Sequence, residues 1–198
     1  MSLCLYGGTF DPPHIAHAII AESLLDQFGL DKILFLPAYL APHKSSQDCS
    51  AIQHRVAMVR LAIAGNPRFE LSTLEADRAD ISYTIDTINA INRVYHLSRE
   101  DFYFLIGSDS LMELHRWRQP QEILRRVTLL VAPRPGFDPG RVQPEFLAEV
   151  QFIQSPVIEI SSSRIREKLR CGESIRYLVN PAVEAYICEH QLYRTEAQ

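Results

Sequence analysis

The stretch Leu3-Cys4-Leu5-Tyr6-Gly7-Gly8-Thr9-Phe10-Asp11-Pro12-Pro13-His14-Ile15-Ala16-His17 decides the fold of this chain. A short apolar run typical of a buried strand stops at two glycines, and an apolar, Ala-rich segment that predicts a helix follows. This order lets backbone N–H groups and a helix N-terminus face a phosphate. His14 and His17 are three residues apart and therefore face the same side of the first helical turns. The stretch predicts an anion site.

Length and charge narrow the class of protein. The 198 residues fit one domain, with room for a small subdomain, and are enough to bury a core. The formal net charge of −4 argues against general nucleic-acid or membrane-surface binding and leaves a local basic patch open. Most of the positive charge is arginine, whose planar fork suits phosphates and carboxylates.

Cysteine spacing and apolar runs indicate neither a disulfide framework nor a targeting segment. The four cysteines lie far apart and form no CxxC pair, so they predict no zinc site. The chain enters a strand without the basic start of a signal peptide, and no apolar run reaches the ~18 residues of a membrane span. We expect a soluble, cytoplasmic protein without nucleic-acid or membrane partners. The sequence leaves its oligomeric state open, a homo-oligomer included.

Strand-like and helix-like segments alternate along the chain. After the opening strand, further strands are predicted at 32–36, 69–73, 102–106 and 127–132, with a weak one at 151–153 or 157–160. Helices are predicted at 15–27, 52–64, 85–95, 111–126 with a break at Pro120, 161–169 and 181–190. Residues 74–82 are expected to form a charged loop, and 137–150 carry no clear pattern. The alternation predicts one α/β domain with a mostly parallel sheet covered on both faces.

The loop at 37–50 follows the second predicted strand, where open α/β sheets bind ligands. His43 and Lys44 stand at its centre and are candidate phosphate ligands. A solvated loop without a ligand explains them equally well.

Two common nucleotide-binding motifs are absent. No GxGxxG follows the first strand, and no GxxxxGK[ST] occurs, which disfavours a dinucleotide oxidoreductase and a P-loop NTPase. His14 and His17 then have three interpretations: a zinc pair, which lacks further ligands at a suitable spacing; structural histidines; or phosphate donors. The last fits best, because imidazole N–H groups hydrogen-bond phosphoryl oxygens, the more strongly when charged.

A second anion site is predicted at Ile160-Ser161-Ser162-Ser163-Arg164-Ile165-Arg166. Hydroxyls and free N–H groups at a helix start, with Arg166 one turn on, suit the outer phosphates of a nucleotide. Alone, the segment is explained as well by an ordinary serine N-cap. Together with the turn at His14 and His17 it favours a polyphosphate ligand.

Three further residues follow or flank a central predicted strand. Gly107 and Asp109 come directly after it, and the Asp109 carboxylate suits ribose hydroxyls, although a helix cap looks the same locally. Trp117 offers a ring for stacking, but a lone tryptophan is more often part of the core.

Together these residues resemble a known family. GGTFDPPHIAH at 7–17 is similar to the GGTFDPxHxGH signature of bacterial nicotinate-nucleotide adenylyltransferases, members of the nucleotidylyltransferase superfamily. ISSSRIR at 160–166 is similar to that superfamily's C-terminal ISSTxIR-type motif. Further similar blocks keep the family's order over nearly the whole chain: 42–44, 82–84, 106–109, Trp117, 134–136 and 172–178.

The resemblance implies a Rossmann-like, doubly wound fold and transfer of AMP from ATP to nicotinate mononucleotide, giving deamido-NAD and pyrophosphate. It implies one domain, 1–198, whose C-terminal helical part (about 161–198) completes the ATP site. The implied catalytic residues are His14, His17 and Arg166. The implied ATP-binding residues are Gly8, Thr9, Phe10, Ser162, Ser163 and Arg166, and the implied mononucleotide-binding residues are Lys44, Thr84, Gly107, Asp109, Trp117 and Arg134.

The chemistry agrees with these roles. The 5′-phosphate of the mononucleotide is already an anionic nucleophile, so no general base is needed. The site must align two nucleotides and neutralise the charge that grows on pyrophosphate. Mg²⁺ is expected as the cofactor, held mainly by phosphates and water, with no protein metal ligand.

Two departures from the motifs leave alternatives. Ala16 replaces the glycine of HxGH, and Ser163 replaces the usual threonine, which keeps the hydroxyl. One alternative is an adenylyltransferase that prefers nicotinamide mononucleotide or another phosphorylated acceptor. The other is a non-catalytic nucleotide sensor, for which Ala16 is the only hint.

Overall fold

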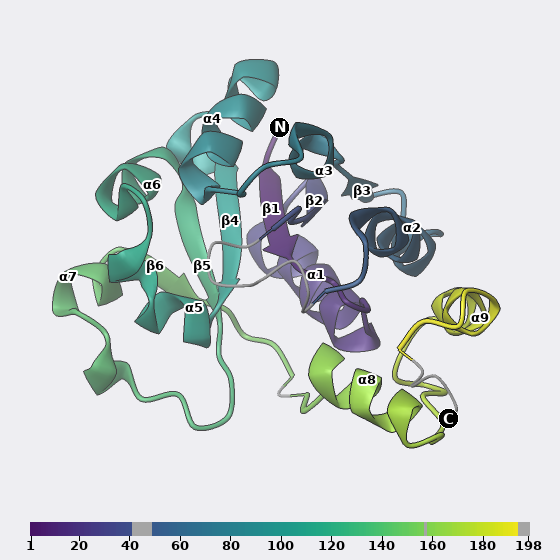
Figure 1. Cartoon of the computed structure of the whole chain (residues 1–198). Coiled ribbons are helices and arrows are strands. Elements are labelled where there is room, and N and C mark those ends of the chain that lie inside the picture. Colours follow the sequence, from purple (N-terminus) through teal and green to yellow (C-terminus); the bar gives the residue numbers. More distant parts are fainter. Residues whose placement is uncertain (41–48, 157, 194–198) are drawn as a thin grey trace.

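The computed structural model describes residues 1–40, 49–156 and 158–193. Its centre is a six-stranded sheet in the order β3-β2-β1-β4-β5-β6, and all neighbouring strands are parallel (Figure 1). The strands are β1 (Leu3–Gly8), β2 (Lys32–Pro37), β3 (Phe69–Leu71), β4 (Phe102–Gly107), β5 (Thr128–Ala132) and β6 (Val150–Phe152). The predicted parallel α/β sheet is confirmed.

The strand order reverses at the centre of the sheet. From β1 the chain builds β2 and β3 on one side, then returns to build β4, β5 and β6 on the other. Ligands of such sheets bind outside the carboxyl ends of the strands at this switch point. β1 ends at Gly8 and β4 ends at Gly107, so both predicted glycine turns lie at this point.

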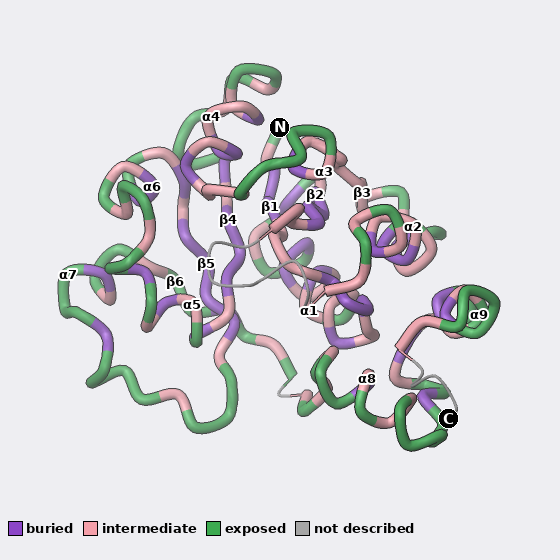
Figure 2. The backbone as a smooth tube through the Cα atoms, in the orientation of Figure 1, coloured by how far each residue is buried: buried purple, intermediate pink, exposed green. Residues whose placement is uncertain are grey.

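Helices cover both faces of the sheet, because alternate side chains of each strand point to opposite sides. Leu3 and Leu5 belong to the same buried cluster as the inner faces of α4 and α6, whereas Cys4 belongs to the cluster of α1 and α2. These helices are α1 (Ile15–Phe28), α2 (Ile52–Ile63), α4 (Thr84–Tyr95) and α6 (Pro120–Arg126). Figure 2 shows the central strands as the most continuously buried part of the chain.

The C-terminal helices α8 (Ser162–Arg170) and α9 (Pro181–Glu189) have a small core of their own. It joins Met58 of α2 to Ile165 and Val183, and α8 lies beside the start of α1 in Figure 1. Both helices start as predicted. The Ser161 side chain accepts the N–H of Arg164, and Asn180 caps a helix whose first residue is a proline.

Several segments differ from the sequence prediction. The expected charged loop contains helix α3 (Leu74–Arg78), which tertiary contact stabilises: buried Glu75 accepts a hydrogen bond of 2.7 Å from Thr87 Oγ1. The break predicted at Pro120 is confirmed, with a φ of 53° at Gln119 directly before it, but the α-helix before the break runs only from Ser108 to Met112. The weak strand is β6, which pairs with β5, so the alternative at 151–153 is confirmed, and the described residues 158–160 form no strand. Within the described residues, the remaining short helices are η2 (Arg99–Asp101), α5 (Ser108–Met112), η3 (Leu114–Arg116), η4 (Pro139–Arg141) and α7 (Pro144–Leu147).

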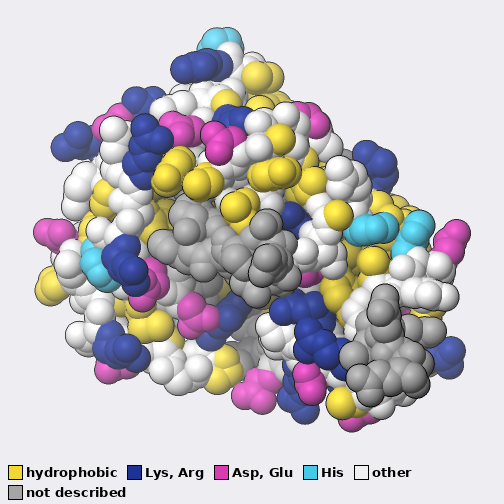
Figure 3. All heavy atoms as spheres, viewed as in Figure 1, with side chains coloured by type: hydrophobic (Ala, Val, Ile, Leu, Met, Phe, Trp, Pro, Cys, Tyr) yellow, Lys and Arg dark blue, Asp and Glu magenta, His cyan; other side chains and the backbone are white. Residues whose placement is uncertain are grey.

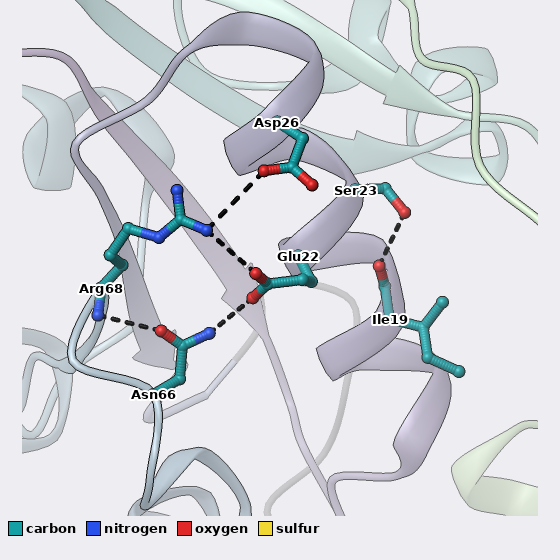
Figure 4. Close-up of polar contacts among 6 residues, drawn as sticks. All are labelled: Ile19, Glu22, Ser23, Asp26, Asn66 and Arg68. Carbon is teal, nitrogen blue, oxygen red and sulfur yellow. Dashed lines mark hydrogen bonds and ion pairs between the residues drawn. The ribbon is translucent and has the colours of Figure 1, made fainter.

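A polar network on the surface ties α1 to the segment after α2 (Figure 4). Glu22 accepts hydrogen bonds from Asn66 Nδ2 at 2.5 Å and from Arg68 at 3.0 Å, and Arg68 lies 3.7 Å from Asp26. The Arg68 side chain is 42% exposed. Exposed pairs of this kind stabilise a fold by about 0–1 kcal/mol each, so packing has the larger part in holding α1.

Candidate active site

The turn after β1 folds back on itself around a buried phenylalanine. Phe10 has a φ of 49° and is 3% exposed, and its ring packs edge-on against His17 at a centroid distance of 5.0 Å. A Cβ on Gly8 would lie 3.0 Å from the Phe10 ring, so the turn needs glycine there. Because the Phe10 side chain is part of the core, only its backbone is left for the role that the sequence predicts in an ATP site.

His14 and His17 lie at the start of α1 with their rings stacked, at a centroid distance of 3.7 Å. The backbone N–H of His14 donates a hydrogen bond to His17 Nδ1 at 3.0 Å. In neutral His17 the ring proton is therefore on Nε2. Burial lowers the pKa of His14 to about 4, and the charge of Arg134 adds to this. Burial, then His14 and Arg134, also lower the pKa of His17 well below its ordinary value. At neutral pH the rings are therefore uncharged donors.

The second predicted anion segment lies directly on the first. Ser162 Oγ donates to the carbonyl of Pro12 at 2.8 Å, and Arg166 donates to the carbonyl of Asp11 at 2.7 Å. The N–H of Ile15 donates to the carbonyl of Leu178 at 3.0 Å. Arg166 also lies 3.5 Å from Ser163 Oγ. Residues more than 140 positions apart in sequence thus form one polar surface at the start of α1, and Figure 3 shows Lys and Arg side chains gathered over and beside α8.

A third group of predicted residues lies at the end of β4. Asp109 and Arg134 form an exposed ion pair of 2.6 Å, and Ser108 Oγ accepts the N–H of Arg134 at 3.1 Å. The Arg134 side chain passes over Gly107, where a Cβ would make an ordinary contact of 3.5 Å with its Nε. Asp109 is also in the first turn of α5, so the helix-start interpretation and the ligand interpretation both fit its position.

Two further predicted residues of the mononucleotide pocket lie on other elements. Trp117 is partly buried against Phe104, with a ring distance of 6.3 Å, so one part of it belongs to the core. Thr84 is the first residue of α4. His43 and Lys44 lie outside the described residues.

Sequence reasoning missed the buried side chains whose hydrogen bonds hold the turn after β1 in place. Arg55 of α2 is 2% exposed, and its guanidinium donates to four backbone carbonyls at 2.6–3.0 Å: those of Thr9, Ala38, Tyr39 and Ser50. Asp11 is also 2% exposed and accepts hydrogen bonds from Ser50 N at 3.1 Å and Tyr193 Oη at 2.5 Å. Asp11 belongs to the motif, but no sequence signal marked Arg55 or Tyr193.

A cavity of about 690 Å³ lies between α1, α2 and the segment 176–184. His14 and His17 form part of its wall, and the rest is mainly apolar, including Val59 and Ile63. Its lining also includes the charged residues Arg176 and Glu184, but neither Arg166 nor Arg134.

Metal ligands and membrane spans were sought in the part of the chain that the structure describes. There, no group of three or more His, Cys, Asp or Glu side chains is placed to hold a metal ion. Nor is any helix of that part both long and apolar enough to cross a membrane.

Comparisons with known proteins agree with this geometry. Residues 5–168 match the Cytidylyltransferase-like family. The chain is 42% identical to a protein of Salinibacter ruber named "Probable nicotinate-nucleotide adenylyltransferase", covering 98% of both chains. It is 40% identical to a protein of the same name from Geobacillus kaustophilus, covering 96% of this chain and 84% of that one.

Solved structures show the same fold at lower identity. Plasmodium falciparum nicotinic acid mononucleotide adenylyltransferase complexed with NaAD superimposes with a TM-score of 0.80, at 22% identity and 97% coverage of both chains. The same enzyme complexed with APC gives 0.78 at 21% identity, covering 97% of this chain and 96% of that one.

The fold and the family match define a cytidylyltransferase-like nucleotidyltransferase, which is an enzyme. Within that class, the chain belongs to the nicotinate-nucleotide adenylyltransferase family. The family resemblance stated from the motifs is confirmed.

Proposed function

We propose that this enzyme transfers AMP from ATP to nicotinate mononucleotide, giving deamido-NAD and pyrophosphate in NAD biosynthesis. The observation that carries this proposal is the contact of the two anion segments: Ser162 and Arg166 bond to the carbonyls of Pro12 and Asp11, beside His14 and His17. A single polyphosphate then meets both segments at once. The names of the relatives support the choice of substrates.

In the proposed reaction, an oxygen of the mononucleotide 5′-phosphate attacks the α-phosphorus of ATP. The bond from that phosphorus to the oxygen bridging to the β-phosphate breaks, and its electrons leave with pyrophosphate. His17 donates Nε2–H to the α-phosphate and His14 to a neighbouring oxygen. Ser162, Ser163 and Arg166 hold the β- and γ-phosphates, where charge grows.

The remaining predicted residues complete the two nucleotide sites. Gly8, Thr9 and Phe10 contribute backbone to the ATP site. On the acceptor side we place Lys44, Thr84, Gly107, Asp109, Trp117 and Arg134. The ion pair between Asp109 and Arg134 keeps an arginine near the histidines, as its effect on their pKa values reflects.

Mg²⁺ enters with ATP in this proposal. The described residues offer hydroxyls and arginines but no carboxylate cluster, which fits an ion held by phosphates and water. Bound there, it would neutralise part of the phosphate charge. We treat 1–198 as one domain whose C-terminal part, about 161–198, completes the ATP site. The cytoplasmic location of the protein stays a prediction, and its oligomeric state stays open.

The test is pyrophosphate release with ATP and Mg²⁺, comparing nicotinate mononucleotide, its amide and phosphopantetheine as acceptors. We expect release with the nicotinate acceptor at a kcat/KM at least tenfold above that of the others (about 1.4 kcal/mol of transition-state discrimination). A preference for another acceptor would keep the reaction and overturn the substrate. ATP binding without release would favour a sensor, and Ala16→Gly would then test whether the motif glycine restores turnover.

A further inference from the structure

Asp11 connects the proposed ATP-binding turn to three distant segments. Its Oδ2 accepts the N–H of Ser50, its Oδ1 accepts the hydroxyl of Tyr193, and its carbonyl accepts Arg166. Asp11 is 2% exposed, so these partners replace the water that its carboxylate would otherwise bind. The position of the turn between β1 and His14 therefore depends on groups far away in sequence.

Tyr193 is the most distant of these partners, 182 residues along the chain. Burial and the negative charge of Asp11 raise the pKa of its hydroxyl, so it stays protonated and donates. Its backbone φ of 66° is left-handed, a conformation that a bulky residue rarely adopts. The contacts of the side chain hold it there: the hydroxyl meets Asp11, and it also lies 3.9 Å from Met58 Sδ.

We propose that Tyr193 is a positioning residue of the ATP site, acting through Asp11. Its hydroxyl bonds to Asp11, which is not itself proposed to bind phosphate, and it fixes the carboxylate that anchors the turn from Thr9 to His14. Hydrogen bonds to a charged group contribute more than neutral ones, and this one is shielded from water. The inference rests on the proposed function only in naming the ligand as ATP.

The alternative is that Tyr193 only packs against the C-terminal core. The variant Tyr193→Phe separates the two roles, because it keeps the ring and removes the hydroxyl. A matched control is Tyr186→Phe. The Tyr186 hydroxyl also makes one side-chain hydrogen bond, 3.0 Å from His54 Nδ1, but its partner lies on α2 and outside the turn.

Three quantities are compared in the full-length variants: KM for ATP, KM for the mononucleotide, and amide hydrogen exchange of a peptide covering 9–17. For Tyr193→Phe we expect about a tenfold rise in KM for ATP, the equivalent of one lost charged hydrogen bond. The mononucleotide KM should stay within about twofold, and exchange in the 9–17 peptide should be faster by a similar factor to the ATP effect. Tyr186→Phe should change none of these.

Equal effects of the two variants, or an unchanged 9–17 peptide in Tyr193→Phe, would overturn the proposal in favour of packing. In an Asp11→Asn background, removing the Tyr193 hydroxyl should have a smaller effect than in the wild type, because the charged partner is gone. Equal effects in both backgrounds would also overturn it. Exchange is measured without substrate, so the role of Tyr193 is decided even if the wild type releases no pyrophosphate, which would count against the proposed function alone.

Discussion

Two arginines of this protein show how differently the same side chain acts in two places. Arg55 is 2% exposed and donates to backbone carbonyls of three segments, one of which is the proposed ATP-binding turn at Thr9. Arg68 has a 42% exposed side chain and pairs with Glu22 and Asp26 on the surface of α1 (Figure 4). Water can replace the partners of Arg68 but not those of Arg55. Buried polar contacts therefore fix the position of the proposed site, whereas exposed ones contribute little to the stability of the elements that carry it.

The largest effect should come from Arg55→Met. It leaves four carbonyls without their donor, and breaking a buried charged network costs about 3–5 kcal/mol. Urea unfolding should show a fall in the free energy of unfolding of about 4 kcal/mol. Arg55→Lys should lose less, because an ammonium keeps the charge and three donors. A fall of less than about 1 kcal/mol in the free energy of unfolding of Arg55→Met would contradict the contrast between buried Arg55 and exposed Arg68.

The next largest effect concerns His17, the half-buried residue proposed to donate to the α-phosphate. His17→Ala should lower kcat about 10²–10³-fold, as removal of one donor to a developing charge does elsewhere. The Kd of a non-hydrolysable ATP analogue should rise only a few-fold. The exposed His115 supplies the control, His115→Ala, with normal turnover. Equal losses in kcat and in ATP affinity would contradict a role in the transition state.

Acid should lower the free energy of unfolding through the two histidines at the start of α1. Native His14 has a pKa of about 4, below the 6.5 of the unfolded chain, so the unfolded state binds more protons between these values. The free energy of unfolding should therefore fall as the pH drops from 6.5 to 4, by roughly 3 kcal/mol for this group. His17 acts in the same direction. In His14→Asn the slope of stability against pH should be shallower by about one proton, and an unchanged slope would refute this origin.

The smallest effect should come from Arg68→Met, a loss of about 0.5 kcal/mol in urea unfolding. Salt sharpens the contrast, because about 1 M NaCl shortens the screening length to about 3 Å. The loss in Arg68→Met should then vanish, while that in Arg55→Met should persist. A loss in Arg68→Met as large as that in Arg55→Met would show that exposure is the wrong criterion.

Much of the fold was predictable because its signals are local. The strands β1, β2, β4 and β5 contain apolar runs that end at glycine or proline. The pair Asn180-Pro181 marks the start of α9. Helix α3 was missed, since Glu75 is stabilised there by Thr87 of another helix. The break before Pro120 was predicted, but its geometry depends on Gln119.

The proposed site also contains residues that the sequence predicted and residues that it did not. The glycines, His14, His17 and the serine N-cap at Ser161 follow from sequence, because a phosphate-binding turn and a helix start are short patterns. The pairing of Tyr193 with Asp11 does not, and neither does the burial of Arg55. A buried polar group needs a hydrogen-bond partner, and which group becomes that partner depends on how the chain packs.

Sequence alone thus determined the alternating α/β pattern and the family, and it predicted the two anion segments. The tertiary structure decided how the two segments meet and which side chains hold them together. The physical reason is the range of the interactions: strand, turn and cap signals act over a few residues, whereas the contact between Tyr193 and Asp11 spans 182. Such a contact exists only once the sheet, α2 and the C-terminal helices are in place.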